Sequence, residues 1–248
     1  MLDKKSDKEI EILREGGKIL AQVRDKLAAA VKIGVTGLEL DAQAQKLIER
    51  AGGKASFKGY SGFPNALCVS VNQTVVHGIP NDQPFAEGDL VGLDIGMEYK
   101  GLFTDTATTV PVGKIDSAAQ KLLDVTKKAL EIGLSQVGPD GYIGDIGKAI
   151  EKYVKPFGFG IVQDLAGHGV GRAVHEDPVI PHYDSGQKLD KMFPGLVIAI
   201  EPMINLGTYE VVIEDDNWGV NSADNTMTAH FEHTVVVTED GYEILTQS

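Results

Sequence analysis

The chain has 248 residues, of which 42% are hydrophobic, and this is enough for a substantial core in one large domain or two small ones. Lys and Arg total 23 against 36 Asp and Glu, so the formal charge of −13 argues against a nucleic-acid-binding surface, which needs clustered positive charge. The sequence lacks an apolar run near the ~18 residues of a membrane span, an apolar signal region and any cysteine besides Cys68, so we expect a cytoplasmic protein without disulfides.

Helices are predicted at the start of the chain, and strands follow them. Capping boxes at Ser6-Glu9 and Thr36-Glu39 precede apolar residues at helical spacing. They predict helices over about 7–31 and from 36 to the Gly52-Gly53 pair. A loop rich in Gly and aromatic residues is expected over 57–64. Short strands are expected after it, over 66–71 and 74–77.

The stretch 90–112 is predicted to form a β-hairpin that carries two carboxylates. Its apolar alternation and Thr-rich second half are typical of paired strands. A turn at Tyr99-Lys100 would place Asp94 directly across from Asp105, whereas a turn at Lys100-Gly101 would make them diagonal neighbours. Both alternatives put the carboxylates on one face, where a pair this close needs a shared proton or a cation to coexist.

The same order of elements returns in the second half of the chain. Helical spacing predicts helices from about 116 and from about 141. The segment 157–165 then leads into Gly167-His-Gly-Val-Gly171 and a Pro-rich loop. Further strands are expected over 196–200, 211–214, 226–237 and 243–246.

Short matches between the two halves suggest an internal repeat. Residues 33–41 align with 137–145, sharing two glycines, the final Asp and an N-cap residue. The other matched pairs are His77-Gly with His168-Gly, 90–94 with 197–201, and Phe103-Thr-Asp105 with His230-Phe-Glu232. We therefore expect one catalytic domain over 1–248 with pseudo-symmetric halves, about 7–112 and 116–246.

The repeat brings four carboxylates and one imidazole to a shared centre: Asp94, Asp105, His168, Glu201 and Glu232. Four carboxylates that converge in a core cannot all be ionised unless cations neutralise them. Oxygen ligands with one nitrogen suit divalent Mn, Fe, Co or Zn, and bridging carboxylates suit a pair of ions about 3.5–4 Å apart. The sequence thus predicts a dinuclear site, in which a bridging water of lowered pKa becomes the nucleophile for hydrolysis.

Each of these residues also has an ordinary structural explanation. A lone Asp in a strand is more often a surface or edge residue, but apolar neighbours imply that Asp94 and Glu201 are buried, and a buried charge needs a partner. The glycines around His168 favour a ligand role, whereas His77 and His175 could equally cap loops. Structural roles remain the default for two other histidines, His182 and His233.

The spacing and flanks of the five residues resemble those of type I methionine aminopeptidases of the short bacterial form, within the pita-bread metallopeptidase family. Asp94 and Asp105 lie eleven apart, and the remaining motifs are Ala166-Gly-His168-Gly-Val-Gly171, Ile200-Glu201-Pro-Met203, Phe231-Glu232-His-Thr234, Asn72, Val76-His77-Gly-Ile-Pro80 and Gly171-Arg-Ala-Val-His175-Glu-Asp-Pro178. The resemblance covers about 10–246. It implies an α+β pita-bread fold, in which helices cover a curved antiparallel sheet.

Two features narrow the resemblance further. Only 33 residues separate His168 from Glu201, which leaves no room for the helical insertion of the type II enzymes. With one cysteine in the sequence, we also expect no N-terminal zinc-binding extension of the eukaryotic type I kind.

The resemblance implies a role for each site residue. Asp94 would chelate one metal, His168 and Glu201 would bind the other, and Asp105 and Glu232 would bridge them. The bridging hydroxide would then attack the first peptide carbonyl, and Glu201 would carry the proton to the leaving amine. The expected catalytic residues are completed by His175, as donor to the carbonyl oxygen or tetrahedral intermediate, and by His77, which positions the scissile peptide. The ions would be two among divalent Co, Mn, Fe, Zn or Ni.

The methionine pocket of this family is lined by aromatic residues and a cysteine, which correspond here to Phe57, Tyr60, Phe63, Cys68 and Trp218. Such a lining suits a polarizable thioether, although without the resemblance these residues would be assigned to the core. The chain departs from the family pattern at two positions. Val174 replaces an aromatic, which predicts a more open pocket wall, and His230 replaces a Gln near Glu232.

Three other classes of protein share some of these features but fit the sequence less well. A proline-directed peptidase of the same fold usually carries a large extra N-terminal domain, for which this chain has no room. A catalytically inactive binding module typically loses ligands, and a metal-buffering protein would not need His77 and His175. The favoured interpretation is metal-dependent excision of the N-terminal methionine from nascent or short peptides. We expect a cytoplasmic monomer that contacts the ribosome at most transiently and binds neither nucleic acid nor membrane.

Overall fold

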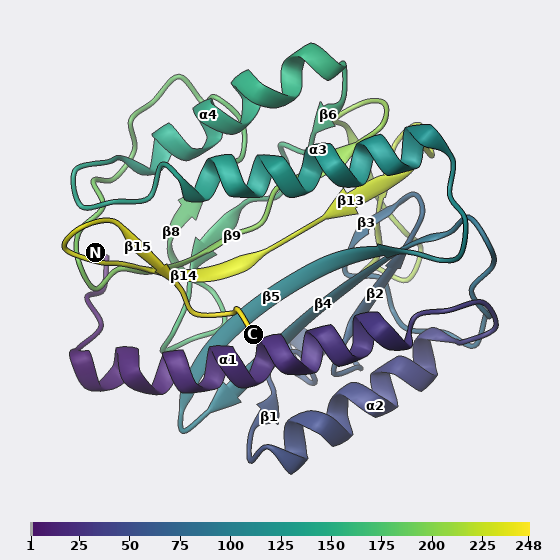
Figure 1. The fold of residues 1–248 in the computed structure, drawn as a ribbon, viewed down its shortest axis with the longest axis horizontal. Coiled ribbons are helices and arrows are strands. Elements are labelled where there is room, and N and C mark those ends of the chain that lie inside the picture. Colours follow the sequence, from purple (N-terminus) through teal and green to yellow (C-terminus); the bar gives the residue numbers. More distant parts are fainter. Residues whose placement is uncertain (1) are drawn as a thin grey trace.

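The computed structural model describes residues 2–248 and combines helices with antiparallel strands (Figure 1). The helices are α1 (Asp7–Ala30), α2 (Gly37–Arg50), α3 (Ser117–Leu134) and α4 (Ile143–Val154), with 3₁₀ turns at Tyr60–Gly62 and Lys155–Phe157. Both predicted capping boxes form, since Ser6 and Thr36 each accept the backbone N–H of the Glu three residues later. The starts of α1 and α2 are therefore fixed by local sequence.

The strands form several small antiparallel sheets. Their orders are β1-β4-β2 with β5 beside β4, β13-β10-β6, β11-β12-β3, and β15-β14-β9-β7-β8. The strand bounds are β1 Lys54–Ala55, β2 Cys68–Val71, β3 Thr74–Val76, β4 Leu90–Tyr99, β5 Leu102–Pro111, β6 Gly160–Ile161, β7 Gly167–Gly169, β8 Glu176–Ile180, β9 Val197–Ile200, β10 Met203–Asn205, β11 Val211–Ile213, β12 Val220–Ser222, β13 Thr228–His230, β14 His233–Val237 and β15 Tyr242–Ile244.

Three sequence-based expectations about elements differ from the structure. The repeat alignment places the second N-cap at Asp140, but α4 begins after Tyr142, whose N–H is bonded to the Asp145 side chain. The segment 226–237 forms two strands instead of one. The strand is interrupted at residues 231–232, where the chain passes from the sheet that contains β13 to the sheet that contains β14. The Pro-rich segment contains β8, an edge strand, where proline is tolerated because it gives up no ladder bond.

The hairpin β4–β5 forms with the second of the two predicted turns. Tyr99 pairs with Leu102, so Lys100 and Gly101 make a two-residue loop, and both have positive φ, as a type I′ turn requires. Gly96 pairs with Asp105, and Asp94 is therefore the diagonal neighbour of Asp105 on the same face.

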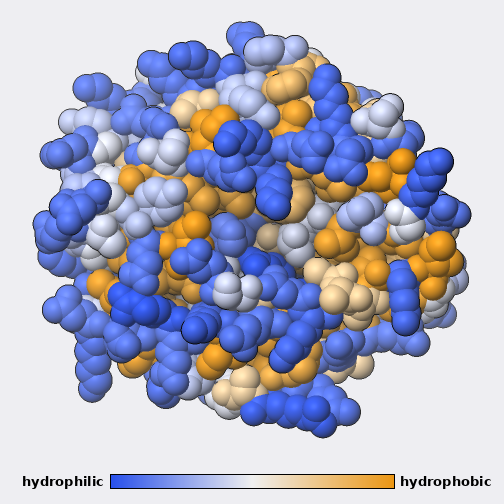
Figure 2. Space-filling model, viewed as in Figure 1, coloured by the Kyte–Doolittle hydropathy of each residue, from blue (hydrophilic) through white to orange (hydrophobic). Residues whose placement is uncertain are grey.

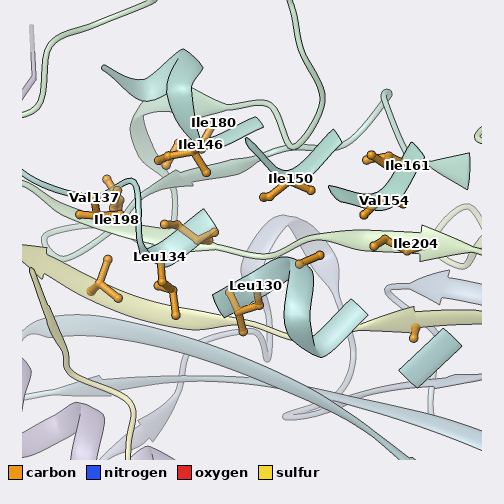
Figure 3. Close-up of a cluster of buried hydrophobic side chains, with 14 of the residues drawn as sticks. Leu130, Leu134, Val137, Ile146, Ile150, Val154, Ile161, Ile180, Ile198 and Ile204 are labelled. Atoms are coloured by element: carbon orange, nitrogen blue, oxygen red, sulfur yellow. The ribbon is translucent and has the colours of Figure 1, made fainter. Parts of the chain in front are cut away.

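Helix pairs lie on either side of the strands in Figure 1, with α1 and α2 along one side and α3 and α4 along the other. The first pair packs on β4 and β5 around a core that includes Leu20, Ile48 and Leu93. In Figure 3, Leu130 and Leu134 of α3 and Ile146 and Ile150 of α4 lie among Ile198, Ile204 and other residues of the second core. Each helix pair therefore packs mainly on the strands of its own half, and Leu13 of α1 also packs in a cluster with residues of β9 and β14.

Threonine side chains join the two halves of the molecule where β5 lies beside β14. The Thr234 hydroxyl accepts the Asp105 N–H (3.0 Å) and donates to the Asp105 carbonyl (2.7 Å). The Thr106 hydroxyl donates to the Glu232 carbonyl at 2.9 Å, and the Glu232 N–H donates to Ala107. These contacts bring the carboxylate-bearing segments of the two halves together.

Hydrophilic side chains cover most of the face seen in Figure 2, and hydrophobic residues show only in patches between them. Within residues 2–248, no helix is both long and apolar enough to cross a membrane. The apolar stripes of the helices are instead directed at the two cores.

Candidate metal centre and active site

One cavity, about 190 Å³ in volume, is lined by all the residues proposed from the sequence for metal binding, catalysis and substrate binding. These residues are Asp94, Asp105, His168, Glu201, Glu232, His77, His175, Phe57, Tyr60, Phe63, Cys68 and Trp218. Ser61 lines the cavity as well. Residues from both halves of the chain therefore meet in one place.

Strand register explains how four carboxylates reach this cavity. Asp94 and Asp105 share a face of the β4–β5 hairpin. In the second half, Ile200 pairs with His233 where β9 meets β14, so Glu201 and Glu232 lie next to each other at the end of that ladder. The bond between Glu232 N–H and Ala107 then joins this ladder end to the hairpin.

The four carboxyl groups strongly resist joint ionisation. Burial raises the pKa of Asp105, Glu201 and Glu232 well above the ordinary range, and the neighbouring carboxylates raise it further. Burial also raises the pKa of Asp94 to about 7, although a hydrogen bond with Asp105 opposes the shift. Without a neutralising charge, the pocket would therefore hold protons on several of these groups at neutral pH.

The donor atoms fit a hard divalent cation. One donor atom each of Asp105, His168 and Glu232 lie within 4.8 Å of one another, and all three residues are buried. Among the described residues, the buried Oδ1 of Asp94 has no hydrogen-bond partner. Buried polar atoms are normally paired, so this oxygen and the crowded carboxylates both indicate that a cation belongs here.

His168 is held in the form that a metal ligand requires. It lies on β7, and burial together with the charge of His175 lowers its pKa to about 4, so the ring is neutral at pH 7. Its Nδ1 lies 2.9 Å from the Gly169 carbonyl oxygen. This oxygen can only accept a hydrogen bond, so Nδ1 carries the proton. The lone pair is therefore on Nε2, which lies 3.5 Å from Glu201 Oε1.

His175 and His77 both line the cavity. The Nδ1 of His175 lies 2.9 Å from the Tyr60 hydroxyl, and its ring centroid is 4.3 Å from that of His168. When Tyr60 donates this bond, neutral His175 carries its proton on Nε2 and can donate it. His77 follows β3 in a left-handed conformation (φ 58°), and burial lowers its pKa.

An apolar wall stands beside the polar centre. Phe57, Phe63, Cys68 and Val174 form a buried cluster, and Trp218 meets Phe63 edge to face at 5.1 Å. Val174 is 5% exposed and packs in this cluster, but it is not one of the residues that line the cavity. The wall and the carboxylates define a cavity with one apolar side and one charged side.

Three histidines make contacts near the site that the sequence did not predict. His182, expected to be structural, is buried and accepts the Glu201 backbone N–H at 3.0 Å, so it fixes the chain next to the carboxylate. His230 Nε2 lies 3.6 Å from Glu201 Oε2. His233 pairs with the Thr246 hydroxyl at 3.0 Å. No sequence spacing distinguishes such histidines from ordinary core residues, because the contacts come from separate strands.

Comparisons with known proteins agree over the whole chain. A family model described as metallopeptidase family M24 matches residues 11–239. Methionine aminopeptidase 1 of Bacillus subtilis is 43% identical over 243 residues, covering 98% of this chain and 98% of that protein. The methionine aminopeptidase of Clostridium perfringens is 41% identical and covers 99% of each chain.

Solved structures give the same result. The crystal structure of methionine aminopeptidase from Thermotoga maritima matches with a TM-score of 0.98 and 38% identity, covering 100% of both chains. Prolidase from Pyrococcus furiosus matches with a TM-score of 0.81 and 23% identity, covering 99% of this chain and 65% of that one. At that identity the prolidase shows a shared fold alone.

Proposed function

The chain belongs to metallopeptidase family M24, and we propose that it removes the N-terminal methionine from peptides by metal-dependent hydrolysis. The family resemblance, the hydrolase class and the α+β pita-bread fold predicted from the motifs are confirmed by the family match, the full-length relatives and the structural neighbours. The observation that carries the proposal is the single cavity in which a carboxylate-rich, metal-suited centre stands beside an apolar wall.

Two divalent ions are proposed for the charged side of the cavity. Asp94 would hold one, His168 and Glu201 the other, and Asp105 and Glu232 both. When bound, such ions supply Lewis acidity for the peptide carbonyl and lower the pKa of a water held between them. The raised pKa values of the carboxyl groups support this assignment, since only cations allow all four to ionise together.

The protein's own side chains would then handle the peptide and its protons. His175 donates from Nε2 to the oxygen on which negative charge develops, while Tyr60 holds Nδ1. His77 lines the same cavity and orients the scissile peptide. Glu201, whose Oε1 lies 3.5 Å from His168 Nε2, would carry the proton to the leaving amine.

The apolar wall is proposed to select the methionine side chain. Phe57, Phe63, Cys68 and Trp218 offer aromatic edges and a soft sulfur to a flexible thioether. Tyr60 lines the cavity between this wall and His175. A peptide with its first side chain against the wall would place its first carbonyl toward the carboxylates.

The same proposal covers the organisation and setting of the enzyme. Both halves contribute residues to the cavity, which supports a single catalytic domain over the whole chain. The substrates would be nascent or short peptides in the cytoplasm. The enzyme would work as a monomer, with at most a transient contact to the ribosome.

Peptide hydrolysis tests the function directly. The metal-stripped protein is loaded with Mn²⁺ or Co²⁺ and given Met-Ala-Ser or a proline-containing dipeptide. We expect metal-dependent release of free methionine from the tripeptide and no cleavage of the dipeptide. Cleavage of the dipeptide alone would favour a proline-directed peptidase. Absence of metal-dependent methionine release would overturn the proposal.

A further inference from the structure

Lys5, which precedes α1, is a buried lysine that does not line the catalytic cavity. Its side chain is only 1% exposed, and its Nζ lies 2.6 Å from Glu176 Oε2. The stem crosses Gly171, where an added Cβ would overlap Lys5 Cε. A buried ammonium is costly unless it is paired. The fold therefore contains a buried ion pair at this point, and the partner of Lys5, Glu176, directly follows His175.

Glu176 uses its second oxygen to close the loop 171–176. Glu176 Oε1 accepts the backbone N–H groups of Arg172 and, at 2.9 Å, Ala173. One carboxylate thus ties the start of the loop to its end and takes the charge of Lys5 at the same time. His175 lies inside the segment that these bonds enclose.

A second ion pair fastens the same loop to the start of α1. The Arg172 guanidinium donates to both oxygens of Glu9, at 2.6 and 2.9 Å, and also bonds Asp3. Arg172 and the capping bonds of Ser6 lower the pKa of Glu9 to about 2, so this pair persists at neutral pH. The Lys5 N–H donates to the Gly195 carbonyl at 2.9 Å, which anchors the segment to the chain just before β9.

We propose that residues 3–9 form an N-terminal clamp that holds the loop 171–176, with Lys5 as a positioning residue for His175. The inference rests on the proposed function, in which His175 donates to the reacting oxygen. His175 is bonded to Tyr60 and its ring contacts that of His168, while the clamp holds the backbone of the loop that carries it. Lys5 touches neither the cavity nor a candidate metal ligand, so its effect passes through His175.

The test compares Lys5→Met with the matched control Lys8→Met, which removes an exposed lysine from the same clamp. Both variants are loaded with Mn²⁺ and assayed on Met-Ala-Ser well below their melting temperatures. We expect Lys5→Met to lower kcat about tenfold or more, because small displacements of a catalytic group are expensive. Bound metal and KM should stay within about twofold of wild type, since the clamp contacts neither. Amide exchange at residues 171–176 should accelerate in Lys5→Met alone.

A double-mutant cycle separates positioning from general weakening of the fold. In a His175→Ala background, Lys5→Met should cause little further loss of kcat, because the group that it positions is gone. Arg172→Met removes the ion pair with Glu9 and should also lower kcat. This second variant keeps the test decisive if Lys5→Met folds poorly.

Two results would overturn the clamp: a Lys5→Met enzyme with the kcat and exchange rates of Lys8→Met, or full additivity with His175→Ala. If the wild-type protein releases no methionine, the proposed function fails instead. In that case amide exchange at 171–176 alone decides whether Lys5 holds the loop.

Discussion

Asp105 lies in a closely constrained position among the four carboxylates. It is 4% exposed, and its Oδ1 accepts the Thr106 N–H at 2.9 Å. Burial raises its pKa, and the charges of Asp94 and Glu201 raise it further. Asn has the same shape and keeps an acceptor for Thr106 but removes the negative charge. Asp105→Asn therefore tests the charge rather than the packing.

We predict that Asp105→Asn abolishes binding of two ions and lowers kcat/KM by about 10²-fold or more, since the ions supply several kcal/mol of transition-state stabilisation. Metal content by elemental analysis and steady-state kinetics measure both effects. Without metal, the variant should lose less stability than wild type as pH rises, because it has one fewer buried carboxyl group to ionise. Asp124→Asn, an exposed change on α3, is the control. An active, doubly loaded Asp105→Asn enzyme would rule out the bridging role.

His175 differs from the carboxylates because it is exposed and lies outside the buried donor group. We predict that His175→Ala keeps its bound metal and its melting temperature but lowers kcat about 10²–10³-fold, the usual cost of one donor to developing charge. Tyr60→Phe keeps the ring and removes only the hydroxyl that bonds Nδ1, so its loss should be smaller. Loss of metal from His175→Ala would place this residue among the ligands instead.

At the scale of elements, the junction between β5 and β14 decides whether the two halves share a site. Thr234 is fully buried and makes two hydrogen bonds to the backbone of Asp105. Thr234→Val has a similar shape but leaves a buried N–H and a buried C=O without that partner, which costs roughly 1–3 kcal/mol for each group.

We therefore predict that Thr234→Val lowers the free energy of unfolding by at least about 2 kcal/mol and weakens metal binding, because Asp105 loses its anchor. Urea unfolding of the metal-free protein and metal titration measure the two effects. Thr234→Ser keeps both bonds and loses only a buried methyl group, about 1 kcal/mol. Its metal affinity should equal that of wild type. Equal metal affinities in both variants would mean that the junction does not orient Asp105.

Local signals in the sequence account for the helices and for the hairpin, but not for the junction. The capping boxes at Ser6 and Thr36 depend on residues three apart, and the hairpin turn is limited to two registers, so these elements are predictable. The register at Lys100-Gly101 remained open because both turns keep the same side-chain alternation. The interruption between β13 and β14 at residues 231–232 and the hydrogen bonds of the Thr234 hydroxyl arise from packing between distant segments.

The same contrast applies to the site. Its chemical groups stand out in the sequence because carboxylates between apolar residues demand a partner, and all of them line one cavity. The contacts that hold those groups in place do not stand out. His182 bonds a backbone N–H, and Lys5 reaches Glu176 across 171 positions, so neither has a local signature.

At the scale of the whole molecule, burial acts in opposite directions on the carboxyl groups and the histidines. A carboxyl group whose folded pKa is raised binds its proton more tightly in the native state, so its contribution to stability is lost as pH rises from the unfolded value, about 4, to the folded one. For Asp94 the loss of stability ends near pH 7. For the three other carboxyl groups it ends well above the ordinary pKa range of a carboxyl group. Histidines with a lowered pKa do the reverse, and their stability is gained as pH rises to about 6.5. This group includes His182 and His230 at about 3, and His168 and His233 at about 4.

Above pH 6.5 the histidine contribution is complete, so the carboxyl groups alone control the trend in the metal-free protein. We predict that its free energy of unfolding falls between pH 6.5 and 8.5 by a few kcal/mol, on the order of 1.4 kcal/mol for each unit through which one group titrates. Protein loaded with Mn²⁺ should show a much flatter profile, because bound ions neutralise the carboxylates and ligand binding adds stability of its own. Urea unfolding of chelator-treated and metal-loaded protein across this range measures both profiles. Metal-free Asp105→Asn should show a shallower decline than metal-free wild type, and parallel profiles for the loaded and stripped proteins would show that the four carboxylates are not the groups that metal neutralises.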